Sequence, residues 1–288
     1  MSMNTTESNV PVVLVFSGHD PSGGAGVQAD IEAIISQGVH PATVITALTV
    51  QDTVNVKRFV ATDPNLVIEQ ARAVLEDMPV ACIKIGMIGS VVLAEVIHSI
   101  LRDYPQIPVV LDPVLVAGGG GALADEAVAR AILTLLLPLT TVLTPNAFES
   151  RVLVELAGGD ARSIESRGAA LIELGAAFVL LKGGDEPGVE VENWLFSGHQ
   201  PPRKFAYERF PGEFHGSGCT LAAAIAGLIA QSSEVDVVNA IHEAQEYTSH
   251  ALYHAAQIGR GQWIPHRLFW ADSPDEGEED ATPVTRIH

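Results

Sequence analysis

Short apolar segments rich in Val, Ile and Leu alternate along the chain with longer segments whose apolar residues recur every three or four positions. The short runs are typical of strands buried on both faces, and the longer spacing is typical of amphipathic helices. The expected strands lie within residues 10–18, 42–50, 81–89, 108–116, 140–145 and 177–184. The expected helices lie within residues 26–38, 63–78, 125–137 and 164–175. This alternation predicts an α/β fold with a mostly parallel sheet covered by helices.

The last third of the chain departs from this alternation. Residues 193–198 and 203–210 indicate a β-hairpin, and a glycine loop and two long helices follow it. No repeat or linker divides residues 11–270, so we expect one domain there. The Gly and Pro clusters are interpreted as loops at strand ends, and in open α/β sheets the ligand crevice lies at the carboxyl ends of the strands.

Composition narrows the possible partners. The chain has 288 residues, 16 of them basic and 35 acidic, for a net charge of -19, which argues against nucleic acid and anionic membranes as partners. Its longest apolar runs are too short to span a bilayer. Residues 1–10 lack the features of a signal peptide, and two cysteines make no disulfide framework, so we expect a cytoplasmic protein with a flexible N-terminus.

The acidic charge is concentrated near the C-terminus. Residues 272–280 carry six carboxylates in nine positions and nothing apolar to bury. We therefore predict that residues 271–288 form a disordered acidic tail, which serves either to solubilise the protein or to bind a partner.

The first glycine loop, residues 17–30, follows an expected strand and opens an expected helix. Its glycines do not fit the dinucleotide pattern G-x-G-x-x-G, and the chain contains no Walker P-loop. Asp30 is placed either to accept a hydrogen bond from a ligand in the crevice or simply to begin a helix. Gln51 is either an amide that reads a heterocycle or a polar strand end.

Polar residues follow three later strands. Asp112 ends a buried strand and needs a metal, a lysine or backbone groups to offset its desolvation. Asn146 and Glu149 have the spacing of a helix cap, and the alternative is a water-mediated Mg²⁺ site. Lys182 stands at a strand end beside two glycines, where we expect it to contact phosphate.

The loop HGSGCT precedes a long apolar helix. Gly216 and Gly218 free the backbone amides at the helix N-terminus, which predicts an anion site. The positive potential there is expected to lower the pKa of the Cys219 thiol, making it a candidate base for a substrate hydroxyl. The alternative is that Cys219 is a small packing residue. Together the loops supply a carboxylate-lined metal region, a cation and glycine amides, as phosphoryl transfer requires.

In this order the loops resemble those of the hydroxymethylpyrimidine and phosphomethylpyrimidine kinases of thiamine biosynthesis, in the ribokinase superfamily. The segments that carry the resemblance are GHDPSGGAGVQAD, VITALTVQDT, KIGMIG, LDPVLV, TPNAFE, LLKGG and HGSGCTLAAAIA. The resemblance implies a ribokinase-like three-layer α/β/α sandwich with a mostly parallel central sheet. It also implies ATP-dependent phosphorylation of 4-amino-5-hydroxymethyl-2-methylpyrimidine and then of its monophosphate, by a homodimer.

The resemblance implies a role for each matching residue. The aminopyrimidine would be held by Gly18, Asp30, Gln51 and Met87. Mg²⁺ would be organised by Asp112 and Glu149, and ATP would be contacted by Asn146, Lys182 and Thr220. The anion hole would consist of Gly216, Ser217 and Gly218, with Lys182 beside it and Cys219 as the base.

Three departures from the family pattern concern the lid and the ring pocket. Leu115 stands where the family commonly has methionine, a glycine run at Gly118–Gly121 replaces a more polar loop, and His19 extends the first motif. These departures leave room for a related ring, so a pyridoxal or pyridoxine kinase is the first alternative. A non-catalytic pyrimidine-binding protein is the second, and a structural or interaction protein is the third.

Overall fold

The computed structural model of the protein describes residues 10–198, 200–231, 236–271 and 286–287. Its strands are β1 Val12–His19, β2 His40–Gln51, β3 Val56–Ala61, β4 Val80–Ile85, β5 Val109–Leu111, β6 Val142–Leu143, β7 Phe178–Leu181, β8 Glu190–Ser197, β9 Gln200–Glu208 and β10 Arg286–Ile287. Its α-helices are α1 Gly26–Ser36, α2 Pro64–Asp77, α3 Val91–Asp103, α4 Glu126–Ala131, α5 Ala147–Leu156, α6 Ile164–Glu173, α7 Ser217–Ala230 and α8 Val237–Tyr253.

The strands form one sheet in the order β10-β9-β8-β7-β6-β5-β4-β1-β2-β3. The strands from β7 to β2 in this order are parallel, and β3, β8, β9 and β10 pair antiparallel at the two edges. The parallel strands direct their carboxyl ends, and the loops after them, to one edge of the sheet. The predicted mostly parallel sheet is therefore confirmed.

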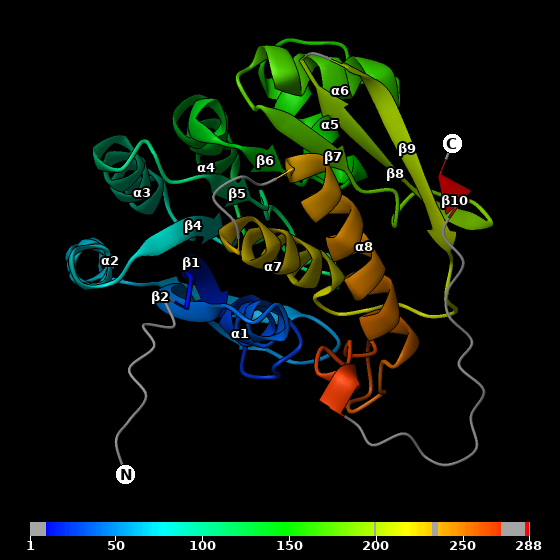
Figure 1. The fold of residues 1–288 in the computed structure, drawn as a ribbon, viewed down its shortest axis with the longest axis horizontal. Coiled ribbons are helices and arrows are strands. Elements are labelled where there is room, and N and C mark those ends of the chain that lie inside the picture. Colours follow the sequence, from blue (N-terminus) through cyan, green and yellow to red (C-terminus); the bar gives the residue numbers. More distant parts are fainter. Residues whose placement is uncertain (1–9, 199, 232–235, 272–285, 288) are drawn as a thin grey trace.

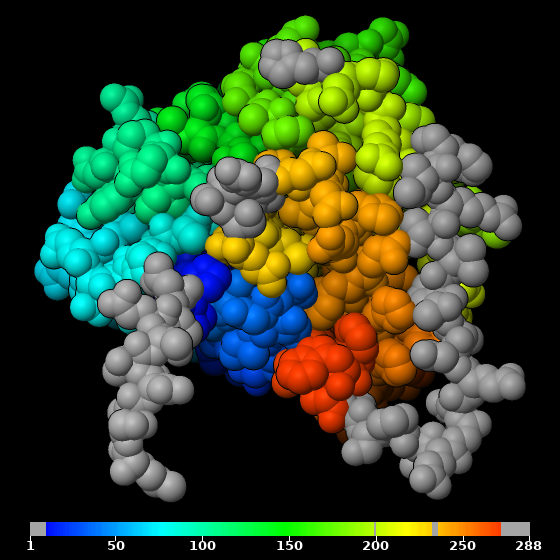
Figure 2. Space-filling model, in the orientation of Figure 1, coloured from blue at the N-terminus to red at the C-terminus, as the bar shows by residue number. Residues whose placement is uncertain are grey.

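Helices cover both faces of this sheet (Figure 1). Val13 and Val15 of β1 pack with α1, α7 and α8, while Leu14 and Phe16 pack in the opposite core with α2 to α6. The face covered by α1, α7 and α8 is the one seen in Figure 2. Alternate residues of β1 are thus buried on opposite sides, as a central parallel strand requires. The structure has the predicted three-layer α/β/α arrangement.

Most of the α-helices begin at a side chain that caps their first turn, and α1, which follows Ala25, does not. The Asp63 carboxylate accepts hydrogen bonds from the first turn of α2, and the Asp125 carboxylate accepts one from Val128 in α4. α7 has no side-chain cap of this kind, because its N-cap residue is Gly216. No N-cap side chain therefore accepts a hydrogen bond from the first amides of α7.

Some predicted boundaries were wrong. The strand expected at 108–116 ends at Leu111, since Pro113 lacks the N–H that a central strand needs. The helix expected at 125–137 becomes a π-helical turn at Ile132–Leu136 and then a 3-10 turn that contains Pro138. The sequence analysis missed β3 and α3 altogether. The apolar residues of segment 91–103 do recur with helical spacing, so α3 could have been predicted.

The two terminal predictions lie largely outside the described residues. Within the predicted tail at 271–288, Ala271 ends a 3-10 turn, and β10 pairs antiparallel with β9. These three residues therefore have secondary structure where the sequence analysis expected disorder. Among the residues that the structure describes, no helix has the length and apolarity needed to cross a membrane.

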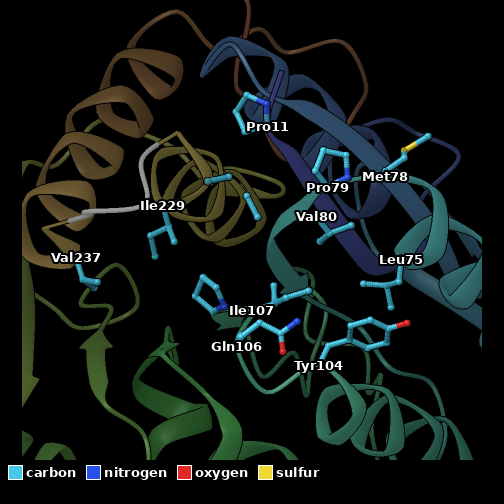
Figure 3. A pocket seen from close by; sticks show the side chains of 13 residues that line it. Pro11, Leu75, Met78, Pro79, Val80, Tyr104, Gln106, Ile107, Ile229 and Val237 are labelled. Atoms are coloured by element: carbon cyan, nitrogen blue, oxygen red, sulfur yellow. The ribbon is translucent and has the colours of Figure 1, made fainter. Parts of the chain in front are cut away.

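A hollow of about 750 Å³ opens at the amino ends of the central strands (Figure 3). It is lined mainly by apolar side chains, among them Pro11, Val80, Ile107 and Ile229. Since β1, β4 and β5 begin here, the hollow lies at the edge of the sheet opposite the glycine loops. It has none of the candidate site residues in its lining.

Candidate active site

The N-terminus of α7 is held against the first glycine loop by a turn that only glycine fits. Gly216 has a φ of 79°, and a Cβ on it would lie 1.9 Å from the carbonyl oxygen of Gly24. The amide of Thr220 is the first to bond inside the turn, to the carbonyl of Gly216. The amides of Ser217, Gly218 and Cys219 precede it, and in such a turn they have no partner within the helix. The geometry supports the predicted anion site.

Lys182 lies directly beside this turn. Its Nζ is 2.8 Å from Asp112 Oδ1, and a Cβ on Gly218 would lie 2.9 Å from the same Nζ. Burial alone would lower the pKa of Lys182, but the carboxylates of Asp112 and Glu149 hold it above its ordinary value. Lys182 is therefore a cation at the expected anion site. It is also the partner of Asp112, for which a metal, a lysine or backbone groups were expected.

Asn146 and Glu149 form the capping box foreseen from their spacing. The Asn146 side chain accepts from the Glu149 amide, and Glu149 Oε2 accepts from the Asn146 amide, both at 2.8 Å. Burial raises the pKa of Glu149 to about 7, Lys182 opposes the rise and Asp112 adds to it. The capping prediction is confirmed, and the metal alternative remains open beside it.

The predicted Mg²⁺ region contains two carboxylates. Asp112 Oδ1 accepts hydrogen bonds from Lys182 and Thr144. Asp112 Oδ2 would lie 3.7 Å from a Cβ added to Gly218. No cluster of three or more His, Cys, Asp or Glu that could hold a metal occurs in the described part of the chain. Such a site fits Mg²⁺, which commonly binds one or two carboxylates and completes its shell with water and phosphate oxygens.

A second buried cation, Lys84, was missed by the sequence analysis. Its Nζ lies 2.7 Å from Asp30 Oδ1, and both side chains are fully buried. Burial alone would lower the pKa of Lys84, but Asp30, Cys219 and Asp112 raise it, so the lysine stays protonated. A lysine inside the apolar strand ACIKIG was the signal that could have revealed it.

This ion pair corrects the position expected for Asp30. The sequence analysis placed its carboxylate in the crevice as a ligand contact, whereas the structure buries it completely against Lys84. Asp30 is therefore placed to stabilise the charge of Lys84, and its contact with a ligand stays a prediction.

The pKa of Cys219 also differs from expectation. Burial raises the pKa of the thiol, whereas Lys84 and the amide of Gly26 lower it. Burial is the larger effect, so the field of the helix N-terminus does not dominate as the sequence analysis supposed. A Cβ on Gly26 would meet the carbonyl of Gly18, and this shows how closely the first glycine loop packs at this point.

The proposed ring pocket collects around the ends of β1 and β2. Met87 lies against Gly18, where an added Cβ would be 2.9 Å from its sulfur. The Gln51 amide lies 3.1 Å from the ring of His215, which is also 2.7 Å from Asp20. His215 and Asp20 were not among the predicted site residues, although each stands within a motif that the sequence analysis quoted. A smaller hollow of about 280 Å³ adjoins, lined by Val54, Glu213, Gly261, Gln262 and Trp263.

Thr220 has a position different from the one expected for a nucleotide contact. It is fully buried, and its hydroxyl donates to the Gly216 carbonyl and accepts from Arg267 Nε at 2.8 Å. Arg267, also buried, donates in addition to the carbonyls of Gly23 and Gly24 and pairs with Glu32. Thr220 thus helps to anchor the glycine loop.

Two of the three departures from the family pattern, Leu115 and the glycine run, lie around the same region. The Leu115 amide donates to Glu149 Oε1 at 3.4 Å, and the Gly121 amide donates to Asn55 at 3.1 Å. A Cβ on Gly119 would lie 2.2 Å from the Val54 carbonyl, so the glycine run packs closely on the loop between β2 and β3. The run therefore belongs to the wall of the crevice.

The arrangement brings an anion turn, a protonated lysine and two carboxylates to one edge of a parallel sheet, beside a pocket with an amide and a thioether. These are the parts from which enzymes build phosphoryl-transfer sites. Fold and site together define a ribokinase-like phosphotransferase.

Comparison with known proteins identifies the family. Residues 20–266 match the phosphomethylpyrimidine kinase family, and the chain belongs to it. The chain is 37% identical to a hydroxymethylpyrimidine/phosphomethylpyrimidine kinase of Synechococcus elongatus over 88% of its own length and 95% of that protein. It is also 36% identical to the bifunctional thiamine biosynthetic enzyme TH1 of Arabidopsis thaliana, over 95% of its own length and 53% of that enzyme.

Two solved structures share the fold. The Staphylococcus aureus pyridoxal kinase in complex with AMP-PCP and pyridoxal superposes with a TM-score of 0.81 at 24% identity, covering 97% of this chain and 98% of that one. A phosphomethylpyrimidine kinase from Clostridium difficile superposes with a TM-score of 0.71 at 29% identity, covering 84% and 99%. The predicted ribokinase-like fold and the predicted kinase family are confirmed.

Glu149 gives the site a testable pH dependence. Its pKa is about 7 when folded, against 4.5 ordinarily, so between these values the folded state binds more protons than the unfolded state. The free energy of unfolding attributable to Glu149 must therefore fall as pH rises from about 4.5 to 7. We expect Glu149→Gln to remove this slope, on the order of 2 kcal/mol over the window.

Urea unfolding of the metal-free protein in EDTA, across this pH range, measures the slope. Glu155→Gln is the matched control, because Glu155 lies on the same helix and is exposed. Equal pH profiles for wild type and Glu149→Gln would contradict the prediction.

Proposed function

We propose that the chain transfers the γ-phosphoryl group of ATP to 4-amino-5-hydroxymethyl-2-methylpyrimidine and then to the resulting monophosphate, as part of thiamine biosynthesis. The kinase domain is assigned to residues 11–270. The observation that carries the proposal is the contact between two halves of one site. The Gly216 turn, which suits phosphate, packs on the glycine loop whose Gly18 meets Met87.

In the first transfer the substrate hydroxyl oxygen bonds to the γ-phosphorus of ATP, and the bond from that phosphorus to the bridging oxygen of ADP breaks. The hydroxyl proton passes to Cys219 Sγ, which acts as the base. Lys84 and the Gly26 amide favour the thiolate that this step needs. The amides of Ser217 and Gly218 and the Lys182 ammonium stabilise the charge that develops on the transferred group.

Asp112, and Glu149 through water, would hold Mg²⁺ in this site. The ion would neutralise phosphate charge as the transfer proceeds. Asn146, which neighbours Lys182 through a bridge between their strand ends, is placed on the nucleotide side. ATP use follows from the kinase family, and the position of the nucleotide here is part of the proposal.

Gln51 and Met87 define the ring pocket of the proposal. Met87 offers an apolar, polarisable surface for a flat ring, and the Gln51 amide offers a polar edge. A pyridoxal kinase is the alternative, because solved pyridoxal kinases share this fold at a TM-score of 0.81. A pyridine ring would use the same surface without an exocyclic amine.

An ATP-consumption assay with Mg²⁺ tests the proposal, with the pyrimidine, its monophosphate and pyridoxal offered separately and the products identified by mass. We expect the pyrimidine to give the monophosphate and then the diphosphate. Turnover of pyridoxal alone would replace the proposed substrate, and binding of the pyrimidine without turnover would favour a non-catalytic protein.

The two transfers should depend differently on Cys219. The first acceptor is an alcohol with a proton to lose, whereas the second is a phosphate monoester whose second pKa is about 6 and which is already ionised at pH 8. We expect Cys219→Ser to lower kcat for the first transfer by ~10²–10⁴-fold. The second transfer should lose less, and KM for the pyrimidine should change little.

Single-turnover kinetics of each transfer at pH 8 provide the measurement. Cys82→Ala is the control, because Cys82 is buried in β4 outside the site. A Cys219→Ser variant with near-normal first transfer would remove the thiol from the mechanism.

We further propose that the enzyme is a cytoplasmic homodimer. Both cysteines are free, which suits a reducing compartment. Leu48 and Val60 form a cross-strand pair between β2 and β3, each more than half exposed, and Val50 lies on the same face. An exposed apolar face of this kind, adjoining the ring pocket, supports self-association.

Val60→Glu places a charge in this face. We expect it to raise the dimer dissociation constant by ~10-fold or more, since a buried unpaired charge opposes association. Light scattering during size-exclusion chromatography measures the mass, with Val92→Glu on the exposed side of α3 as control. A monomeric wild type, or an unchanged dimer in Val60→Glu, would contradict the dimer proposal.

A further inference from the structure

His215 is the point at which three segments of the ring pocket meet. Its side chain is 4% exposed, and its Nε2 lies 2.7 Å from Asp20 Oδ2 and 3.1 Å from the Gln51 amide nitrogen. A Cβ on Gly24 would lie 2.0 Å from Cδ2 of the His215 ring, so that ring packs tightly against the glycine loop. The backbone amide of His215 donates to the Trp263 carbonyl at 2.8 Å. The imidazole is therefore fixed from several sides.

Asp20 determines where the proton between these groups lies. Its carboxylate accepts from the Ala25 amide at 2.9 Å and from the amide and hydroxyl of Ser22. Burial alone would raise the pKa of Asp20, but the hydrogen bonds from His215 and Ser22 lower it below its ordinary value. Asp20 is thus an ionised acceptor, and a nitrogen 2.7 Å from it must be the donor. His215 Nε2 carries a proton whether the ring is neutral or cationic.

This proton dictates how the Gln51 amide is turned. An amide NH₂ group facing a protonated Nε2 would set two donors against each other at 3.1 Å. A half-turn of the amide exchanges its nitrogen and oxygen and moves no other heavy atom. The Gln51 carbonyl oxygen then shares the His215 proton with Asp20, and the NH₂ group takes the position that the oxygen held, directed away from His215.

We propose that His215, held by Asp20, is a positioning residue that presents the Gln51 NH₂ group to the substrate as a hydrogen-bond donor. The site accordingly selects a ring that offers an unprotonated nitrogen or another acceptor at that edge. The inference rests on the proposed function for the identity of the ring. The orientation of Gln51 itself follows from His215 and Asp20 alone.

A double-mutant cycle tests whether His215 acts through Gln51. His215→Phe keeps a ring against Gly24 and removes the donor. We expect it to weaken binding of the pyrimidine by ~10-fold in calorimetry, the cost of one misdirected hydrogen bond. KM for the pyrimidine should rise with kcat and KM for ATP unchanged, and His215→Gln, which restores an N–H donor, should recover much of the affinity.

Combining the changes distinguishes positioning from general damage. If His215 acts through Gln51, the double variant His215→Phe with Gln51→Ala should bind the pyrimidine as Gln51→Ala does, within about twofold. Losses that multiply would overturn the inference. A His215→Gln variant as weak as His215→Phe would also count against it.

A second measurement needs no substrate. In protein with ¹⁵N-labelled histidine, NMR reports which ring nitrogen carries the proton, and the signal absent from His215→Gln assigns His215. We expect Nε2 to be protonated, and an unprotonated Nε2 would overturn the inference even if the cycle behaved as expected. If the wild type fails to bind the pyrimidine, the proposed function fails, while this measurement still decides the state of His215.

Discussion

The site depends on two lysines that are kept charged inside the protein. Lys84 lies at the end of β4 and Lys182 follows β7, and each is held by one carboxylate, Asp30 and Asp112 respectively. A buried cation without a partner would lose its proton or unfold its surroundings, so each carboxylate is required where it stands. Because the parallel strands end at one edge, both cations lie near the N-terminus of α7. The resulting positive region is what a transferring phosphoryl group needs.

The glycine loops hold the groups around this charge in a fixed arrangement. Gly216 lets the first turn of α7 approach Gly24. Arg267 donates hydrogen bonds to the carbonyls of Gly23 and Gly24 and to the Thr220 hydroxyl, and so links the glycine loop to α7. These contacts fix amides, thiol and lysine relative to one another before any substrate arrives. Such preorganisation is the main protein contribution in phosphoryl transfer, because the chemistry itself asks for little covalent participation.

The parts of the fold and the site that depend on neighbouring residues in the chain could be predicted from the sequence. The apolar runs gave the parallel sheet, the spacing of Asn146 and Glu149 gave the capping box, and the apolar strand before Asp112 required a partner for it. The position of Asp30, the pKa of Cys219 and the role of His215 could not, because each depends on which distant side chains burial brings together. The sequence analysis expected a lowered pKa for Cys219, whereas burial raises it, and the extent of that burial follows only from packing.

The buried cation Lys84 lowers the pKa of the thiol beside the expected phosphate site, and alkylation of Cys219 measures this effect. The rate of reaction with iodoacetamide against pH, in a Cys82→Ala background, gives the pKa of the thiol. Lys84→Met should shift this profile to higher pH, because Lys84 lowers the pKa of Cys219. Lys204→Met, which removes a lysine paired with Glu192 elsewhere on the sheet, should leave it unchanged. An unaltered profile in Lys84→Met would contradict the account.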